Sequence, residues 1–193
     1  MKMYRRDFIK IISAAVGYSA LGAGLMASSR GQSTPTQNSL VFDAMGEIRD
    51  VYPRKLIKEI LDSGLNAITV TLCDPKTFEH EAFEAAKDGI LHYDRLIAKY
   101  PDLYTKAIKV SDINISRQEG KLAIFYLFQN STQFSRDLDL VDTFYELGVR
   151  STQITYNYQN WAGAGCKERT GAGLTYFGLE LVEKMNEVGM LID

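Results

Sequence analysis

Three glycines constrain the fold of this chain more than any other feature, because each separates a helical pattern from a strand-like segment. They are Gly64, Gly148 and Gly189. Before each glycine, apolar residues recur at three- and four-residue spacing, which places them on one face of a helix. Glycine readily takes the left-handed conformation that ends a helix. The repeated order of helix, glycine and strand predicts an α/β chain with a parallel sheet.

The last of these units has the clearest boundaries. Thr175 is expected to cap the free amides at the start of the helix, with Leu174 and Leu179 packing as a hydrophobic staple. The helix should end at Gly189, and residues 190–192 should begin a parallel strand covered on both faces. The other elements that we expect are a first strand at 40–43, a helix from 53 with a strand at 67–71, a helix at 77–99, a turn-rich segment at 112–119, a buried strand at 122–128, and a helix from 137 with a strand at 149–155.

The first 27 residues have the features of an export signal. Arg5 and Arg6 are followed by Asp, Phe, Ile and Lys, which matches the twin-arginine pattern. The next stretch, at 11–26, is only weakly apolar; an amino-terminal membrane anchor is the alternative to a signal. Residues 28–39 are polar and are predicted to form a flexible linker. We therefore predict export across the bacterial inner membrane by the twin-arginine machinery, to the periplasm or envelope.

The charge of the chain limits its partners. Without residues 1–27 the chain has 18 basic and 23 acidic residues, a net charge of −5. It then has no basic run and no basic patch with interleaved aromatic residues. This composition argues against nucleic acid as a partner, because nucleic-acid binding depends on clustered positive charge.

The chain has two cysteines and two histidines. Cys73 and Cys166 are expected at the same end of the sheet, where a disulfide is allowed but two free, partly buried thiols are favoured. His80 and His92 lie on one predicted helix, about 120° apart around its axis, so they cannot share a metal there. We interpret both histidines as surface or packing residues.

The C-terminal part of the chain resembles the membrane dipeptidase (renal dipeptidase-like) family of zinc peptidases. The resemblance rests on FYELGVRSTQITYN, on the tryptophan loop NWAGAGC, and on TGAGLTYFGLELVEKMNEVGMLID. It spans residues 120–193 and extends weakly to VFDAMGEIR near the start. The resemblance implies a (β/α)8 TIM-barrel-type fold with a two-zinc site at the carboxyl ends of its strands.

The chain is short for this fold. A complete barrel needs about 250 residues, whereas the chain has 193 and stops within a predicted strand. We expect residues 40–193 to form an incomplete N-terminal portion of the barrel, truncated at its C-terminal end. The last strand should then have an open edge and an uncovered apolar face.

The resemblance also locates the family's metal ligands. The family's first strand ends in Asp-Gly-His-Asn-Asp, and here Met45 holds the histidine position and Glu47 the second aspartate position. Gln129 corresponds to the glutamate that bridges both zincs. A thioether is a soft ligand and an amide is neutral, so these side chains suit zinc poorly. We interpret the three residues as a degraded metal site, with zinc as the cofactor that the resemblance implies.

Substrate contacts are implied in a loop that follows a later strand. Tyr156 takes the place of a family histidine that contacts the substrate or the tetrahedral intermediate. Tyrosine cannot shuttle a proton near neutral pH, because its pKa is about 10. Asn157 and Trp161 match the family's pattern and are expected to bind substrate with Tyr156. No catalytic residue is assigned.

Three functions are compatible with these residues. The resemblance implies hydrolysis of dipeptides by metal-activated water, with this fragment alone inactive. The alternative is a non-catalytic barrel, a pseudoenzyme that binds a small peptide or envelope ligand. A third hypothesis is a different hydrolytic reaction in which Glu47 or Tyr156 has a new role. The expected partners are a small peptide or dipeptide-like ligand and, by the resemblance, a second copy in a homodimer.

Overall fold

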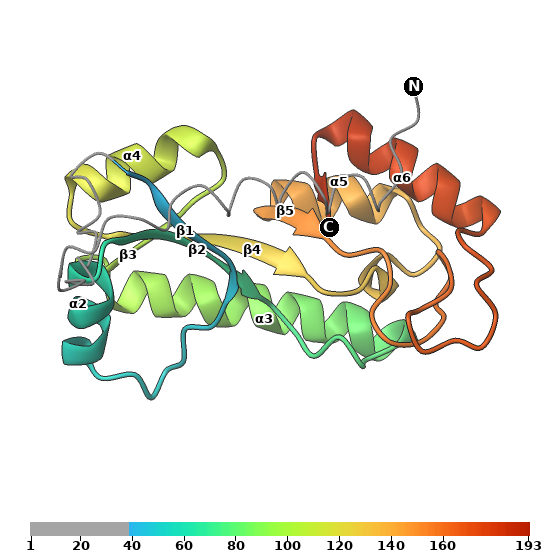
Figure 1. Cartoon of the computed structure of the whole chain (residues 1–193), viewed down its shortest axis with the longest axis horizontal. Helices are drawn as coiled ribbons and strands as arrows, with labels where there is room; N and C mark the ends of the chain where they lie inside the picture. Colours follow the sequence, from blue (N-terminus) through green and yellow to red (C-terminus); the bar gives the residue numbers. More distant parts are fainter. Residues whose placement is uncertain (1–38) are drawn as a thin grey trace, which may run out of the picture. The chain divides into compact units, whose positions relative to one another are not determined.

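The computed structural model describes residues 39–193, which form a curled sheet of six parallel strands with helices (Figure 1). The strand order is β1-β2-β4-β5-β6, and every neighbouring pair is parallel. β3 pairs with the beginning of β4, and β5 pairs with its end. The strands are β1 (Val41–Gly46), β2 (Leu65–Thr71), β3 (Tyr104–Lys106), β4 (Leu122–Phe128), β5 (Val149–Thr152) and β6 (Leu191–Ile192). The predicted α/β parallel sheet is confirmed, and its form is an incomplete TIM-type barrel.

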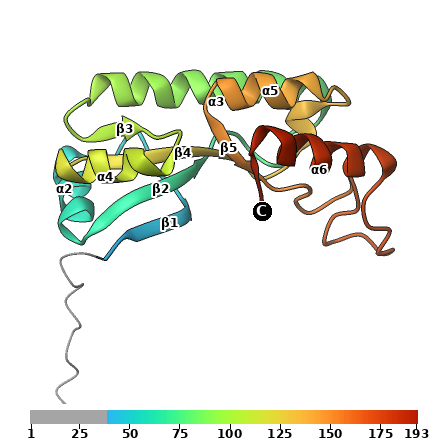
Figure 2. The same ribbon diagram turned by 90° about the horizontal axis from the view of Figure 1, so that it is seen from above.

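Two hydrophobic clusters lie on opposite faces of this sheet. The larger cluster contains the β4 side chains Ile124, Tyr126 and Phe128, together with residues of α3 and α5. Figure 2 shows α3 and α5 along the same side of the sheet. The smaller cluster joins Ala123 of β4 to Ile113 of α4. The helices are α2 (Arg54–Asp62), α3 (Glu79–Lys99), α4 (Val110–Gln118), α5 (Asp139–Glu146) and α6 (Tyr176–Val188), with a 3-10 turn, η1 (Thr132–Phe134).

The prediction of a turn-rich segment at 112–119 is wrong, because α4 occupies it. The carboxylate of Asp112 accepts the amides of Ile108 and Lys109 at 2.9 and 3.1 Å, which satisfies free donors at the start of the helix. Ile113 is 6% exposed and packs against alanines of β2 and β4. Only Ile113 and Ser116 of this helix are buried, so the sequence has too few apolar positions to show a helical period.

The three helix–glycine–strand units are confirmed, but the expectation that the last strand is covered on both faces is wrong, because β6 lies at the edge of the sheet and is not buried. Gly64, Gly148 and Gly189 have φ values of 98°, 105° and 80°, in the region that favours glycine. Thr175 caps α6 as expected, accepting the amide of Gly178 at 3.0 Å. Strand boundaries differ from the prediction: β1 continues to Gly46, whereas β5 stops at Thr152.

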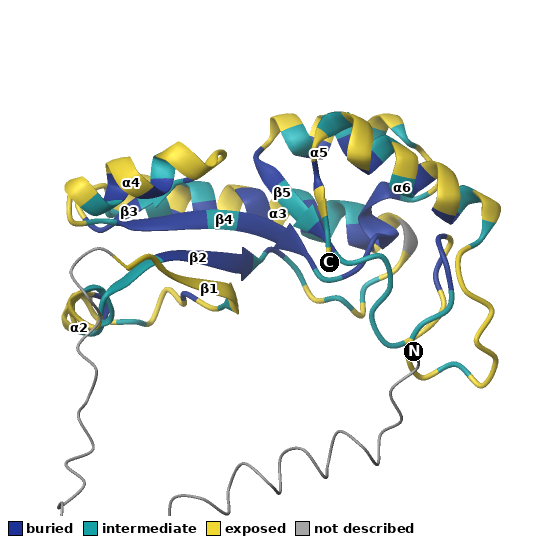
Figure 3. Cartoon of the chain, turned by 45° about the horizontal axis from the view of Figure 1, so that its top comes forward, coloured by how far each residue is buried: buried dark blue, intermediate teal, exposed yellow. Residues whose placement is uncertain are grey.

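The two edges of the sheet, β1 and β6, are much more exposed than its middle. Figure 3 shows β4 as largely buried and β1 as largely exposed. Phe42 on β1 is 46% exposed and Leu191 on β6 is 68% exposed. Both line a cavity of about 710 Å³ beside α4, on the sheet face that carries Phe125. The expected open edge and uncovered apolar face are therefore present in the described residues.

The predictions for the first part of the chain lie outside the described residues. These are the export signal at 1–27 and the linker at 28–39, of which only Ser39 is described. Among the helices of residues 39–193, none has the length and apolar character that crossing a membrane requires.

Candidate functional site

A pocket of about 500 Å³ lies at the carboxyl ends of β1, β2 and β4. The carboxyl ends of parallel strands meet at one edge of a sheet, which is where barrel proteins build their sites. Met45 and Glu47 enter the pocket from β1 and the loop after it, and Gln129 enters from the end of β4. The structure therefore brings together the three residues predicted as metal positions. The other lining residues are Gly46, Thr71, Cys73, Asp74, Pro75 and Tyr93.

Met45 and Gln129 contact each other directly in this pocket. The amide nitrogen Nε2 of Gln129 donates to the Sδ of Met45 at 2.7 Å. The carboxylate of Asp43 accepts the backbone amide of Met45 at 3.2 Å, within the irregular last part of β1. A thioether is a weak acceptor and an amide is uncharged, so this pair brings no negative charge to the pocket.

Glu47 supplies a carboxylate, but Arg49 already engages it. The two side chains form an ion pair at 2.7 Å and a hydrogen bond at 2.8 Å. The hydrogen bond from Arg49 lowers the pKa of Glu47, so this carboxylate is ionised and neutralised by its own neighbour. Its oxygens are therefore satisfied within the chain.

The residues present do not fit a two-zinc centre. Two adjacent divalent cations need several charged ligands, usually carboxylates and imidazoles. Within residues 39–193, no three His, Cys, Asp or Glu side chains lie close enough together to hold a metal ion. His92 lies 3.6 Å from Asp50, and His80 lines a different cavity. We therefore assign no reaction step to zinc in the described residues.

Two further side chains of the pocket are neutral groups held by the fold. Burial raises the pKa of the Cys73 thiol, whose Sγ accepts the amide of Gln133 at 3.2 Å. Burial also raises the pKa of Tyr93 to about 12, and its hydroxyl donates to the carbonyl of Ile48 at 3.3 Å. Both groups are therefore protonated at neutral pH, and they line the pocket as uncharged side chains.

The two cysteines are free thiols, as favoured from the sequence. Cys166 is exposed, with its Sγ 3.7 Å from the Oδ1 of Asn157. The expectation that both thiols are partly buried is correct for Cys73 and wrong for Cys166, because the long loop after β5 carries Cys166 at the surface.

The residues predicted to bind substrate lie in the loop after β5. Tyr156, Asn157 and Trp161 do not line the strand-end pocket. Asn157 accepts the amide of Lys167 at 2.8 Å through its backbone carbonyl, which closes the loop on itself. Trp161 lines two other cavities, and the guanidinium of Arg136 lies 5.2 Å from its ring centroid. The substrate-binding role of these residues stays a prediction.

A buried polar network holds the loop after β5 against the loop after β4. Asn160, which is 9% exposed, donates to Asn130 at 2.6 Å, to Ser131 at 3.1 Å and to the carbonyl of Ile154 at 2.8 Å. Its oxygen accepts the amides of Ala162 and Gly163. Sequence reasoning missed this network, although small amide and hydroxyl side chains after two neighbouring strands are the signal that could have found it.

Comparison with known proteins identifies one matching family model, described as membrane dipeptidase (peptidase family M19), which matches residues 46–193. Rat dipeptidase 3 is 32% identical over 124 residues, which cover 61% of this chain and 25% of that protein. An uncharacterized dipeptidase of Schizosaccharomyces pombe is 33% identical over 106 residues, covering 51% of this chain and 25% of that one.

Solved structures are similar over most of this chain. An amidohydrolase from Pseudomonas aeruginosa has a TM-score of 0.70 and 34% identity, and the match covers 80% of this chain and 45% of that one. A metallopeptidase from Rhodobacter sphaeroides, liganded with a phosphinate mimic of L-Ala-D-Ala, has a TM-score of 0.70 but 15% identity, so it shares the fold. It is matched over 80% of this chain and 57% of its own. The chain spans a quarter of these curated relatives and about half of the solved structures.

Proposed function

Because the chain belongs to the membrane dipeptidase family, peptidase family M19, we propose that it acts as a hydrolase of the dipeptidase type. The family consists of metallopeptidases, and the resemblance noted in the sequence is confirmed. The strand-end pocket is the proposed substrate site. The full activity of the longer relatives, their substrates and their metal are proposals for this chain.

One observation carries this proposal: Met45, Glu47 and Gln129 meet in one pocket at the carboxyl ends of β1 and β4. Barrel enzymes place their chemistry at this end of the strands. Gln129 lines this pocket, and we propose that its amide hydrogen-bonds to the carboxylate of a dipeptide in place of its contact with Met45. The residues do not fit a two-zinc centre, so the proposed contribution of residues 39–193 is binding and orientation of the peptide.

A second candidate function is capture of a small peptide without hydrolysis. The contact between Gln129 and Met45 favours it, because the side chains at two of the family's metal-ligand positions here hydrogen-bond to each other. A barrel with such a pocket would keep the family's peptide selectivity and lose its metal-dependent step.

The 193-residue chain tests both candidates with the dipeptide L-Ala-D-Ala as the probe. Calorimetry measures binding, elemental analysis measures zinc per chain, and release of free alanine measures turnover. Gln129→Ala should weaken binding about tenfold, because it removes a pocket hydrogen bond worth about 1.4 kcal/mol. Gln159→Ala, in the exposed loop after β5, is the matched control.

Each outcome separates the candidates. Turnover that is lost in Gln129→Ala supports the hydrolase. Binding without turnover selects peptide capture. Two zincs per chain would overturn the conclusion that these residues do not fit the metal centre, and no binding at all would overturn both functions.

For location and partners we propose twin-arginine export to the periplasm or envelope, no nucleic-acid partner, and a homodimer. The export proposal rests on the sequence at residues 5–10, and the exclusion of nucleic acid rests on the net negative charge. Cell fractionation of wild type and of a variant with both Arg5 and Arg6 changed to Lys should show loss of the exported form in the variant.

A further inference from the structure

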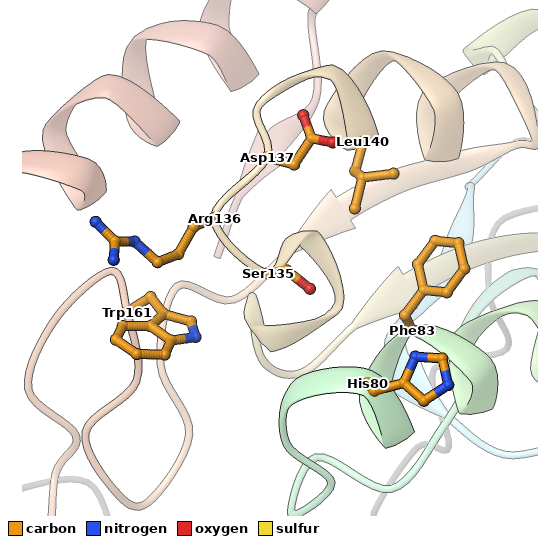
Figure 4. A pocket seen from close by; sticks show the side chains of 7 residues that line it. All are labelled: His80, Phe83, Ser135, Arg136, Asp137, Leu140 and Trp161. Atoms are coloured by element: carbon orange, nitrogen blue, oxygen red, sulfur yellow. The ribbon is translucent and has the colours of Figure 1, made fainter.

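A cavity of about 540 Å³ lies between the start of α3, the segment from η1 to α5, and the loop after β5 (Figure 4). It shares no lining residue with the strand-end pocket. We propose that this cavity binds an amphipathic carboxylate, meaning a monoanion that joins one carboxylate to an apolar or aromatic group. The residues that carry the argument are His80, Phe83, Ser135, Arg136, Leu140 and Trp161.

Three hydrogen-bond donors face this cavity without an acceptor. They are the hydroxyl of Ser135, the ring of His80 and the indole N–H of Trp161, and none of these side chains hydrogen-bonds to another residue in the range 39–193. Imidazole carries at least one N–H, and an indole N–H can only donate. Figure 4 shows the three groups around the same space. A ligand that complements them must be rich in acceptors, and a carboxylate offers two oxygens.

The backbone at Ser135 supports a role for its hydroxyl. Its φ of 52° and ψ of −117° make it the one non-glycine residue with positive φ among those described. Glycine adopts such a conformation at lower cost, and strained residues of this kind gather at ligand sites. A serine at this position lowers the stability of the fold relative to glycine, and it places a hydroxyl in the cavity.

The charges around the cavity favour a monoanion. Arg136 stacks on Trp161 and has no carboxylate within ion-pair distance in the part of the chain that the structure describes. Asp137 also borders the cavity, but its carboxylate accepts the amide of Asp139 at 3.0 Å and points away from the donors in Figure 4. Glu84 also interacts electrostatically with His80, and Lys87 pairs with that carboxylate at 2.8 Å. The charged groups around the cavity therefore nearly balance, so a dianion such as phosphate would gain less than a carboxylate.

The walls of the cavity require an apolar part of the ligand. Phe83 and Leu140 line it and also pack against the main hydrophobic cluster. The volume lies within the ordinary range of small-molecule sites, about 300–1,000 Å³. An aromatic side group on the carboxylate would cover these walls and the indole of Trp161.

Trp161 makes the test direct, because the chain has a single tryptophan. We would titrate the 193-residue chain with N-acetyl-L-phenylalanine and with its uncharged amide, and follow tryptophan emission. The acid should give a saturable change, at least about tenfold tighter than the amide, as expected for a charge-assisted hydrogen bond. Inorganic phosphate should give no saturable change below about 10 mM.

Single-residue variants test whether the change in tryptophan emission comes from binding in this cavity. Ser135→Gly keeps the backbone conformation and removes the hydroxyl, and His80→Gln removes the ring; each should weaken binding about fivefold or more. His92→Gln, on the same helix but beside Asp50, and Met45→Ala, in the strand-end pocket, should leave the titration unchanged. Equal responses to acid and amide, or wild-type binding by Ser135→Gly and His80→Gln, would overturn the proposal. The strand-end function would stand in that case, because it uses none of these residues.

Discussion

The two faces of β4 differ in how completely they are covered. On one face Tyr126 and Phe128 have no exposed surface, and Phe128 lies edge-on to Phe144 with ring centroids 5.0 Å apart. On the other face Phe125 is only partly buried, and its neighbour Phe42 is 46% exposed. The face covered by α3 and α5 therefore supplies most of the hydrophobic stability, whereas the face that carries α4 leaves part of its apolar surface exposed.

The largest expected effect tests this difference with two identical residue types in one strand. Phe128→Ala should lower the free energy of unfolding by about 3–5 kcal/mol, because it opens a cavity in a closed aromatic cluster. Phe125→Ala should cost about 1–2 kcal/mol, because its site is already partly exposed. Urea unfolding followed by circular dichroism measures both values. Similar losses for the two variants would mean that the faces contribute equally.

The second-largest loss of stability is expected from the buried polar network that joins the loops after β4 and β5. Asn160→Ala removes one hydrogen bond each from Asn130 and Ser131 and leaves the backbone amides of Ala162 and Gly163 without their acceptor, so we expect a loss of about 1–3 kcal/mol. Asn186→Ala, at an exposed site on α6, is the matched control and should change stability little. A neutral Asn160→Ala variant would show that water replaces the side chain.

The smallest expected effect concerns pH and the phenol of Tyr93 between α3 and β1. Its pKa is raised to about 12 in the folded chain, above about 10 in the unfolded chain, so the folded state retains the proton more strongly. This contribution is complete below pH 10 and is lost as the pH rises toward 12. The urea midpoint should therefore fall between about pH 10 and 12, and the fall should be smaller in Tyr93→Phe. An equal fall in both proteins would assign the effect to other groups.

Much of the fold could be predicted from the sequence because its signals are local. Gly148 and Gly189 end helices through their own backbone conformations, and Thr175 caps α6 through a hydrogen bond three residues away. α4 could not be predicted, since its stability depends on the contact of Ile113 with alanines that are distant in the sequence.

The candidate sites were likewise predictable from the sequence only in part. Met45 and Gln129 could be placed from the family's strand-end motif, and the structure brings them together. The cavity beside Trp161 could not be predicted, because His80, Ser135 and Trp161 come from three separate segments and meet only in the folded chain. The strained backbone at Ser135 likewise could not be predicted from the residue type, since serine is common in loops.

The pairing of β4 has a consequence for the order in which the chain can fold on the ribosome. One edge of β4 pairs with β2, but its other edge is divided between β3, which is synthesised before it, and β5, which is synthesised after it. The beginning of β4 can therefore acquire both neighbours as soon as it emerges, whereas its end must wait for residues 149–152. That late end carries Phe128, and its aromatic partners Phe134 and Phe144 are also synthesised after it, so nascent chains should pair the beginning of β4 before they close this aromatic cluster.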